Sequence, residues 1–288
     1  MGNNSDISST SNNVSYIVNG TEPDSCLHGD PGHVSKIMFG SGVFGNILAL
    51  IVLFRSFPDQ KRNIFYRLVA GLTITDLLGT TLTSPVVIAV HANDCQWIGG
   101  QTMCNYFGFM MILAGYATML IICCMSIERV ICIRHPYIYR TRSSTKHATH
   151  ILLTCWSLAA FISLLPFMGF GDIVLQYPYT WCFFDYYSTS PEHKAFNYFY
   201  AIVAILIILV TGCCNLTSMC TLFNHCRNQD IRHGTGEKSR KYCRSKKYRD
   251  CQMLVQIIGI TLVFSTCYLP LMVCIVICCS KYWRYIVK

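Results

Sequence analysis

The sequence predicts an all-α protein, a bundle of six helices that cross a membrane. Only 13% of its 288 residues are charged and the mean hydropathy is +0.39, whereas a soluble domain carries about 25% charged residues. Six continuous apolar stretches also have the roughly 20 residues that a spanning helix needs, whereas a membrane β-barrel shows alternating segments of about ten residues. We expect the spans at Val34–Phe54, Phe65–Val90, Asn105–Ile133, Ala148–Phe167, Phe196–Phe223 and Met253–Cys279.

The distribution of basic residues predicts the orientation of the bundle. Most of the 23 Lys and Arg residues follow the first, third and fifth stretches, and the first 33 residues contain none. The positive-inside rule therefore places these three loops in the cytoplasm and the amino terminus outside a cell membrane. The basic run Lys238–Arg249 is then expected to face the anionic inner leaflet of the bilayer, so no nucleic-acid partner is expected.

Three segments are expected along the chain. Residues 1–33 form an extracellular tail with glycosylation sequons at Asn3, Asn13 and Asn19; chance sequons in an Asn- and Ser-rich tail are the alternative. Residues 34–279 form the helical bundle. Residues 280–288 form a short carboxyl-terminal segment.

Most of the 18 cysteines lie in apolar stretches or cytoplasmic loops, where thiols stay reduced. Four face outside: Cys26, Cys95, Cys104 and Cys182. A disulfide between Cys104, which heads the third span, and Cys182 would fix the second outer loop across the mouth of the bundle, and we expect this pair. For Cys26 and Cys95 the pairing stays open, because sequence does not give connectivity.

Polar residues inside membrane spans are functional candidates because burying them is costly. Asn46 lies in the first span, Asp76 in the second, the pair Glu128 and Arg129 at the inner end of the third, and Pro270 in the sixth. An ordinary charge pair at the membrane interface is the alternative for Glu128 and Arg129. A simple helix kink is the alternative for Pro270.

The order and spacing of five features resemble the rhodopsin-like G-protein-coupled receptors: Gly45-Asn46, Asp76, Cys104, Glu128-Arg129-Val130 and Cys267-Tyr268-Leu269-Pro270. The resemblance implies a rhodopsin-like bundle of which six of seven helices are present. It also implies that Glu128 holds Arg129 in the inactive state, and that Arg129 faces the G protein when the sixth helix swings out about Pro270. Asp76 and Tyr268 are implied as further switch residues, with Tyr268 at the position of the usual Trp.

Two longer segments resemble the prostanoid receptors within that family. Gly71–Pro85, GLTITDLLGTTLTSP, is similar to their second helix, and Gln176–Phe183, QYPYTWCF, is similar to their second outer loop. Within the prostanoid receptors the pattern is most similar to the fourth subtype of prostaglandin E2 receptor. The resemblance implies prostaglandin E2 or a related prostanoid as ligand, and a heterotrimeric G protein of the stimulatory kind, which raises cyclic AMP.

The expected ligand-binding residues are Ser84, Val87, His91, Met111, Thr180 and Trp181. Met111 lies where amine receptors carry an Asp, so the site has no counter-ion for a cation there. The resemblance implies that Thr180 donates a hydrogen bond to the prostanoid, that Trp181 shields it and that Ser84 lines the pocket. Val87 and His91 stand where the similar subtype has a threonine and a tyrosine, so affinity or prostanoid preference is expected to differ.

The carboxyl end departs from the family pattern. Members of the family continue into a seventh helix with an Arg that binds the prostanoid carboxylate, whereas this sequence stops at Lys288. Lys281, Arg284 and Lys288 are possible replacements, although the short tail argues against them. The expectation is a truncated receptor; the alternative is a non-signalling isoform that associates with a full-length receptor and retains it.

Two other classes of membrane protein lack support in the sequence. A voltage-gated channel needs a span with Lys or Arg at every third position, and the fourth stretch has none. A membrane enzyme needs clustered His, Glu or Asp residues, and the histidines are scattered at span ends. No enzymatic activity, cofactor or metal is expected.

Overall fold

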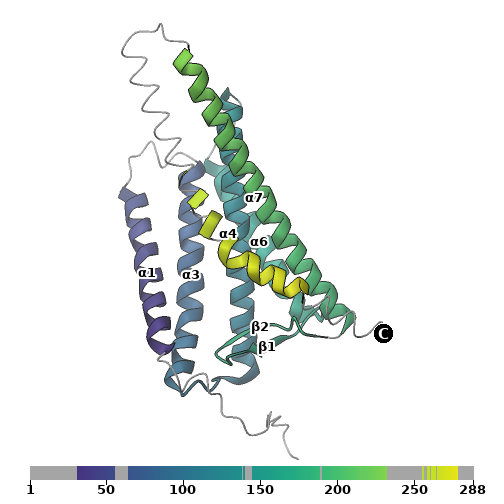
Figure 1. The fold of residues 1–288 in the computed structure, drawn as a ribbon. Helices are drawn as coiled ribbons and strands as arrows, with labels where there is room; N and C mark the ends of the chain where they lie inside the picture. The colour runs from purple at the N-terminus through teal and green to yellow at the C-terminus, as the bar shows by residue number, and fades with distance from the viewer. Residues whose placement is uncertain are drawn as a thin grey trace, which may run out of the picture.

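The computed structural model describes residues 31–55, 64–137, 139, 145–188, 190–231, 255, 258–259, 261–263 and 265–277. Within these ranges it is a bundle of long helices that run alternately up and down (Figure 1). Asn3, Asn13, Asn19, Cys26 and the segment 280–288 lie outside the described residues, so glycosylation and the nature of the two ends of the chain stay predictions.

The helices correspond to the apolar stretches. They are α1 (Pro31–Arg55), α3 (Ile64–Ala92), α4 (Gly100–Arg134), α6 (Thr145–Leu164) with the 3-10 turn η1 (Leu165–Met168), and α7 (Pro191–Ile231). These five are long and apolar enough to cross a membrane, and the shorter apolar helix Thr261–Ile277 follows them. The predicted all-α transmembrane bundle is confirmed.

Glycine and proline mark the helix ends. Gly99, with φ of 82°, precedes α4, and a left-handed backbone of this kind is one that glycine adopts without strain. His135 directly follows α4 and precedes Pro136, and a residue before proline is disfavoured in the helical region. Pro191 is the first residue of α7, where a missing backbone N–H costs nothing.

Threonine hydroxyls on α3 are satisfied within the helix itself. Thr73, Thr75, Thr81 and Thr83 each donate to the carbonyl oxygen four residues earlier, at 2.7–2.8 Å. A hydroxyl in the bilayer core has no water to bond with and therefore needs such an acceptor within the protein. This bonding explains how a span with many polar residues remains compatible with lipid.

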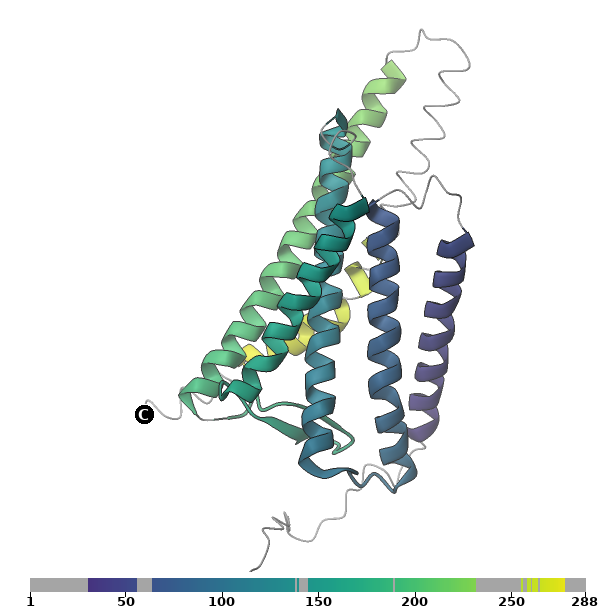
Figure 2. The ribbon, with the colours of Figure 1, turned by 180° about the vertical axis from the view of Figure 1, so that it is seen from behind.

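Helix α4 lies at the centre of the bundle. It packs against α3, α6, α7 and both strands, and more than half of its most apolar 18 residues are buried. Figures 1 and 2 show α3 and α7 on either side of it, with α1 at the edge of the bundle beyond α3. A cluster of buried residues joins α4 to α6 and α7, with Tyr116 and Tyr200 fully buried at its centre.

A two-stranded antiparallel hairpin covers the end of the bundle where α3 ends and α4 begins (Figure 1). It consists of β1 (Ile173–Gln176) and β2 (Trp181–Phe184), with Leu175 opposite Cys182. The expected Cys104–Cys182 disulfide is present and ties β2 to the start of α4. Cys95 is disulfide-bonded as well.

Large apolar side chains on the outer surface of the helices agree with a lipid environment. Phe44 on α1, Leu153 on α6 and Leu206 on α7 are more than half exposed. In water such surfaces would be unfavourable, whereas hydrocarbon solvates them. The protein is therefore a multi-pass membrane protein.

One hydrogen bond across the core gives a testable prediction. The Tyr116 hydroxyl donates to the Tyr200 carbonyl oxygen at 2.6 Å, and both residues are buried. Tyr116→Phe removes this bond, at a cost of about 1 kcal/mol, and is expected to lower the Tm of the detergent-solubilised protein by about 2 °C or more. The control is Tyr106→Phe. The Tyr106 hydroxyl donates to the Leu82 carbonyl oxygen at 3.2 Å, but Tyr106 is exposed, so the loss of this bond is expected to cost less. Equal Tm losses in the two variants would contradict the prediction.

Candidate functional site

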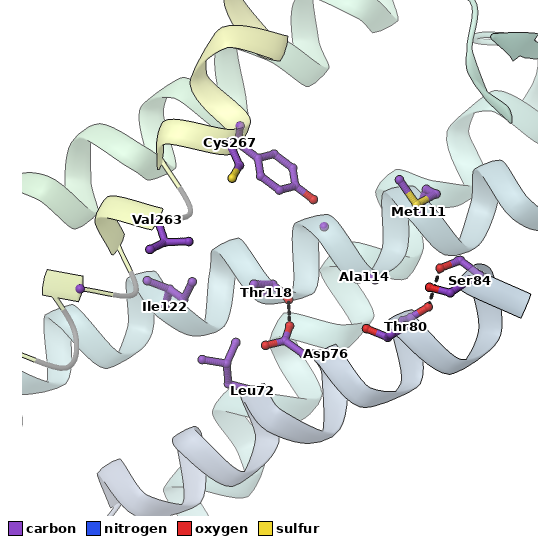
Figure 3. Close-up of a pocket in the computed structure, with 15 residues that line it drawn as sticks. Leu72, Asp76, Thr80, Ser84, Met111, Ala114, Thr118, Ile122, Val263 and Cys267 are labelled. Carbon is purple, nitrogen blue, oxygen red and sulfur yellow. Dashed lines mark hydrogen bonds between the residues drawn. The ribbon is translucent and has the colours of Figure 1, made fainter. Parts of the chain in front are cut away.

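A cavity of about 710 Å³ lies between α3, α4 and the helix Thr261–Ile277. Its walls are mainly apolar or hydroxylic, and Figure 3 shows the labelled side chains of the three helices turned toward one another. The lining residues are Leu72, Asp76, Gly79, Thr80, Thr83, Ser84, Met111, Ala114, Gly115, Thr118, Ile122, Gly259, Val263, Cys267 and Tyr268. The volume is in the range of small-molecule sites, about 300–1,000 Å³.

Asp76 is the one charged residue among the described residues that line this cavity. The Thr118 hydroxyl of α4 donates to Asp76 Oδ1 at 2.9 Å, as the dashed line in Figure 3 marks. A carboxylate at this depth of a bilayer requires such a donor. The sequence identified Asp76 and missed Thr118, because only the packing of α3 on α4 brings them together.

The outer part of the cavity contains Ser84 of α3 and Met111 of α4 (Figure 3). Deeper in the bundle, Tyr268 approaches α4 at Gly115, where an added Cβ would lie 2.5 Å from the Tyr268 hydroxyl oxygen. Glycine at position 115 therefore leaves the space that the tyrosine occupies. The structure brings these four predicted residues into one cavity: Asp76, Ser84, Met111 and Tyr268.

The hairpin residues lie against the outer end of the same region. Thr180 is buried at the turn before β2, and the Trp181 indole donates to the Tyr177 carbonyl oxygen at 3.1 Å. Trp181, Met111 and Val87 pack on one apolar cluster around the Cys104–Cys182 disulfide. Trp181 and Val87 thus lie close to the cavity wall at Met111, although they do not line the cavity itself.

His91 is placed differently from the other expected ligand residues. Its Nδ1 lies 2.8 Å from the Val87 carbonyl oxygen, one turn earlier on α3. The residue belongs neither to the cavity lining nor to the cluster around the disulfide. A role for His91 in ligand binding is therefore supported by sequence position alone.

The predicted switch pair lies at the other end of α4. Arg129 donates from Nε to Glu128 Oε2 at 2.6 Å, and its Nη2 lies 2.6 Å from the same oxygen. Arg129 is 2% exposed and Glu128 7%, so the pair is buried rather than an exposed interface pair. Pro270, the other residue of the expected switch, lies within the helix Thr261–Ile277 and is exposed.

Tyr139 joins this pair from the segment that follows α4. Its hydroxyl donates to Glu128 Oε1, so both oxygens of the carboxylate are hydrogen-bonded. Burial, and then the Glu128 charge, raise the pKa of the Tyr139 phenol, so it remains a donor at physiological pH. Tyr139 was not predictable from the sequence, since no spacing rule relates a residue after a helix to a carboxylate eleven residues earlier.

Helix α7 also contacts the helix Thr261–Ile277 through a polar pair. Asn215 Nδ2 donates to Thr261 Oγ1 at 2.9 Å, and Asn215 is buried. The Asn215 amide is therefore engaged within the bundle. This hydrogen bond also gives α7 and the helix Thr261–Ile277 a directional contact in the inner half of the bundle.

The Thr118–Asp76 bond can be tested with two matched variants. Thr118→Val removes the donor to a carboxylate, which is expected to cost about 1.5–3 kcal/mol and to lower Tm by about 3 °C or more. Thr118→Ser keeps the hydroxyl and is expected to retain most of the stability. The measurement is thermal unfolding of the purified protein. Equal losses in the two variants would contradict the prediction, because Thr118→Ser keeps the hydroxyl donor and Thr118→Val does not.

Proteins of known identity resemble the chain over most of its length. It is 34% identical over 279 residues to the prostaglandin E2 receptor EP4 subtype of Oryctolagus cuniculus, an alignment that covers 86% of this chain and 57% of the relative. It is 41% identical over 186 residues to the EP4 subtype of Homo sapiens, covering 65% of this chain and 38% of the relative. The EP3 subtype of Homo sapiens is 30% identical over 250 residues, covering 82% and 62%. The chain thus spans about half the length of the relatives that it matches.

The fold agrees with these relatives. The crystal structure of squid rhodopsin superposes with a TM-score of 0.79 at 18% identity, covering 90% of this chain and 74% of rhodopsin. The model of the rhodopsin family of seven-transmembrane receptors matches residues 45–284. Members of this family are receptors rather than enzymes. The chain therefore belongs to the rhodopsin family of seven-transmembrane receptors, and within that family it is similar to the prostaglandin E2 receptors.

Proposed function

We propose that this chain recognises prostaglandin E2 or a related prostanoid and acts on a heterotrimeric G protein of the stimulatory kind, which raises cyclic AMP. The observation that carries the proposal is the cavity of about 710 Å³, which has a largely apolar wall and several hydroxyl groups. A prostanoid is a flexible acyl chain with a few oxygen atoms. Such a ligand needs contact area from the wall and orientation from a few polar groups.

The proposed ligand contacts divide by position. Ser84 offers a hydroxyl and Met111 a flexible thioether inside the cavity. Thr180 and Trp181 close the site from the hairpin, while Val87 and His91 lie at the outer end of α3. No Lys or Arg lines the cavity among the residues that the structure describes.

The proposed signalling step concerns the inner end of the bundle. Arg129 is held by Glu128, and Glu128 is held by Tyr139. In the resting state this arrangement keeps the guanidinium buried. Outward movement of the helix that contains Tyr268 and Pro270 would open the inner end and let Arg129 contact the G protein.

The direct test uses cells that express this chain with an extracellular epitope tag. Saturable binding of tritiated prostaglandin E2 to their membranes and a ligand-dependent rise in cyclic AMP are expected, both normalised to surface labelling. Binding without cyclic AMP would contradict stimulatory coupling while leaving prostanoid recognition supported. Absent binding by a chain that reaches the surface would contradict the proposal as a whole.

Cavity occupancy predicts the effect of one substitution. Met111→Trp fills part of the cavity and is expected to weaken prostaglandin E2 binding about tenfold or more, equivalent to about 1.4 kcal/mol. The matched control is Leu158→Trp, because Leu158 is 48% exposed on the lipid-facing side of α6. The measurement is the Kd from saturation binding. The same loss in both variants would indicate general misfolding and would argue against the cavity as the site.

The alternative function, a non-signalling isoform that retains a full-length receptor, has a distinct outcome in these cells. A coexpressed full-length prostaglandin E2 receptor would lose surface labelling in proportion to the amount of this chain. This chain alone would give no ligand-dependent rise in cyclic AMP. A constant surface level of the coexpressed receptor would rule the alternative out.

A further inference from the structure

Arg129 is in contact with an aromatic ring that the switch motif does not include. The guanidinium carbon lies 4.2 Å from the centroid of the Phe65 ring. A cation within about 6 Å of the face of an aromatic ring is attracted by the quadrupole of the ring, and the attraction grows when both groups are desolvated. Phe65 and Arg129 are each 2% exposed, so this contact is fully shielded from solvent.

Phe65 comes from a different helix than Arg129. It is the second residue of α3, which begins at Ile64, whereas Arg129 lies near the end of α4. Glu128 restrains the edge of the guanidinium group through one carboxylate oxygen. Phe65 restrains the group from another side and couples it to the neighbouring helix.

The ring of Phe65 is held in place by the packing around it. It belongs to a buried cluster with Leu68 of the same helix and with Ile121 and Met125 of α4. A ring packed in this way cannot follow Arg129 when the guanidinium moves, so movement of Arg129 breaks the contact.

We propose that Phe65 is a positioning residue that holds Arg129 in the resting state through a buried cation–π contact between α3 and α4. Activation then requires Arg129 to leave both Glu128 and the Phe65 ring. This inference rests on the proposed function, because it assigns a part of the same switch. Helix α3 then supplies part of the resting-state restraint on Arg129 through Phe65, in addition to the restraint that Glu128 supplies within α4.

The first test is ligand-independent G-protein activation, normalised to surface expression. Phe65→Leu keeps an apolar side chain and removes the ring, and a five- to thirtyfold rise in basal activity is expected, the ratio that corresponds to a desolvated contact of about 1–2 kcal/mol. Phe65→Tyr keeps the ring and is expected to stay near the unmodified protein. The matched control is Tyr66→Leu, which removes an adjacent ring that does not lie over Arg129, and its basal activity is expected to be unchanged.

Two outcomes of this test would overturn the inference. One is an equal rise in Phe65→Leu and Phe65→Tyr, which would assign the effect to packing rather than to the ring. The other is an unchanged basal activity in Phe65→Leu in a system where Glu128→Gln raises it. Glu128→Gln removes the charge partner of Arg129 and thus reports whether the chain couples to a G protein at all.

A second measurement does not depend on coupling. In a double-mutant cycle of thermal unfolding, Phe65→Leu and Arg129→Gln are measured singly and together. If the ring binds the guanidinium, the Tm loss of the double variant is expected to be smaller than the sum of the two single losses. Additive losses would overturn the inference even if the proposed signalling were correct. Non-additive losses in a chain without G-protein coupling would support the contact while contradicting the proposed function.

Discussion

Inside a bilayer, a polar side chain has no water to bond with, so each one needs a partner within the bundle. Helix α4 takes part in the polar contacts between helices because it touches α3, α6, α7 and the hairpin. Thr118 bonds to Asp76, Tyr116 bonds to the backbone at Tyr200, and Arg129 pairs with Glu128. The three bonds lie at successive depths along one helix. The positions of α3 and α7 against α4 are therefore fixed by polar as well as apolar contacts.

The outer end of α4 meets a second constraint, which is covalent. The Cys104–Cys182 disulfide places β2 across the mouth of the bundle. Because β1 pairs with β2 from Ile173 to Gln176, the whole hairpin is held there. Trp181 then packs on the same cluster as Met111. A loop that would otherwise sample many conformations thus becomes a fixed part of the region above the cavity.

The sequence predicted the helices well because a membrane leaves a strong one-dimensional signal. About 20 apolar residues in a row have few alternatives to a spanning helix. The hairpin was not predicted as strands, although the run at 173–176 and the aromatic run at 181–184, separated by Pro178, carry an ordinary hairpin signal. Its resemblance to a family loop drew attention to function rather than to secondary structure.

The candidate site was predictable only in part, for a physical reason. Asp76, Glu128 and Arg129 stand out because a charge in an apolar stretch is costly wherever it packs. Their partners Thr118, Tyr139 and Phe65 are ordinary residues for their segments, and their importance arises only when two segments meet. Ser84 and Met111 were found through family resemblance, and the packing of α3 on α4 places both of them in the cavity.

The cavity and the buried arginine share a wall, and this bears on how one can influence the other. Ile122 lines the inner end of the cavity and also belongs to the buried cluster that contains Phe65. A ligand changes the state of Arg129 only if it binds with different affinities to the protein with Arg129 buried and to the protein with Arg129 released. A tenfold difference in affinity corresponds to about 1.4 kcal/mol, which is close to the strength of one cation–π contact, about 0.5–2 kcal/mol. A restraint built from a few contacts of this size is strong enough to keep the arginine buried and weak enough for a ligand to overcome.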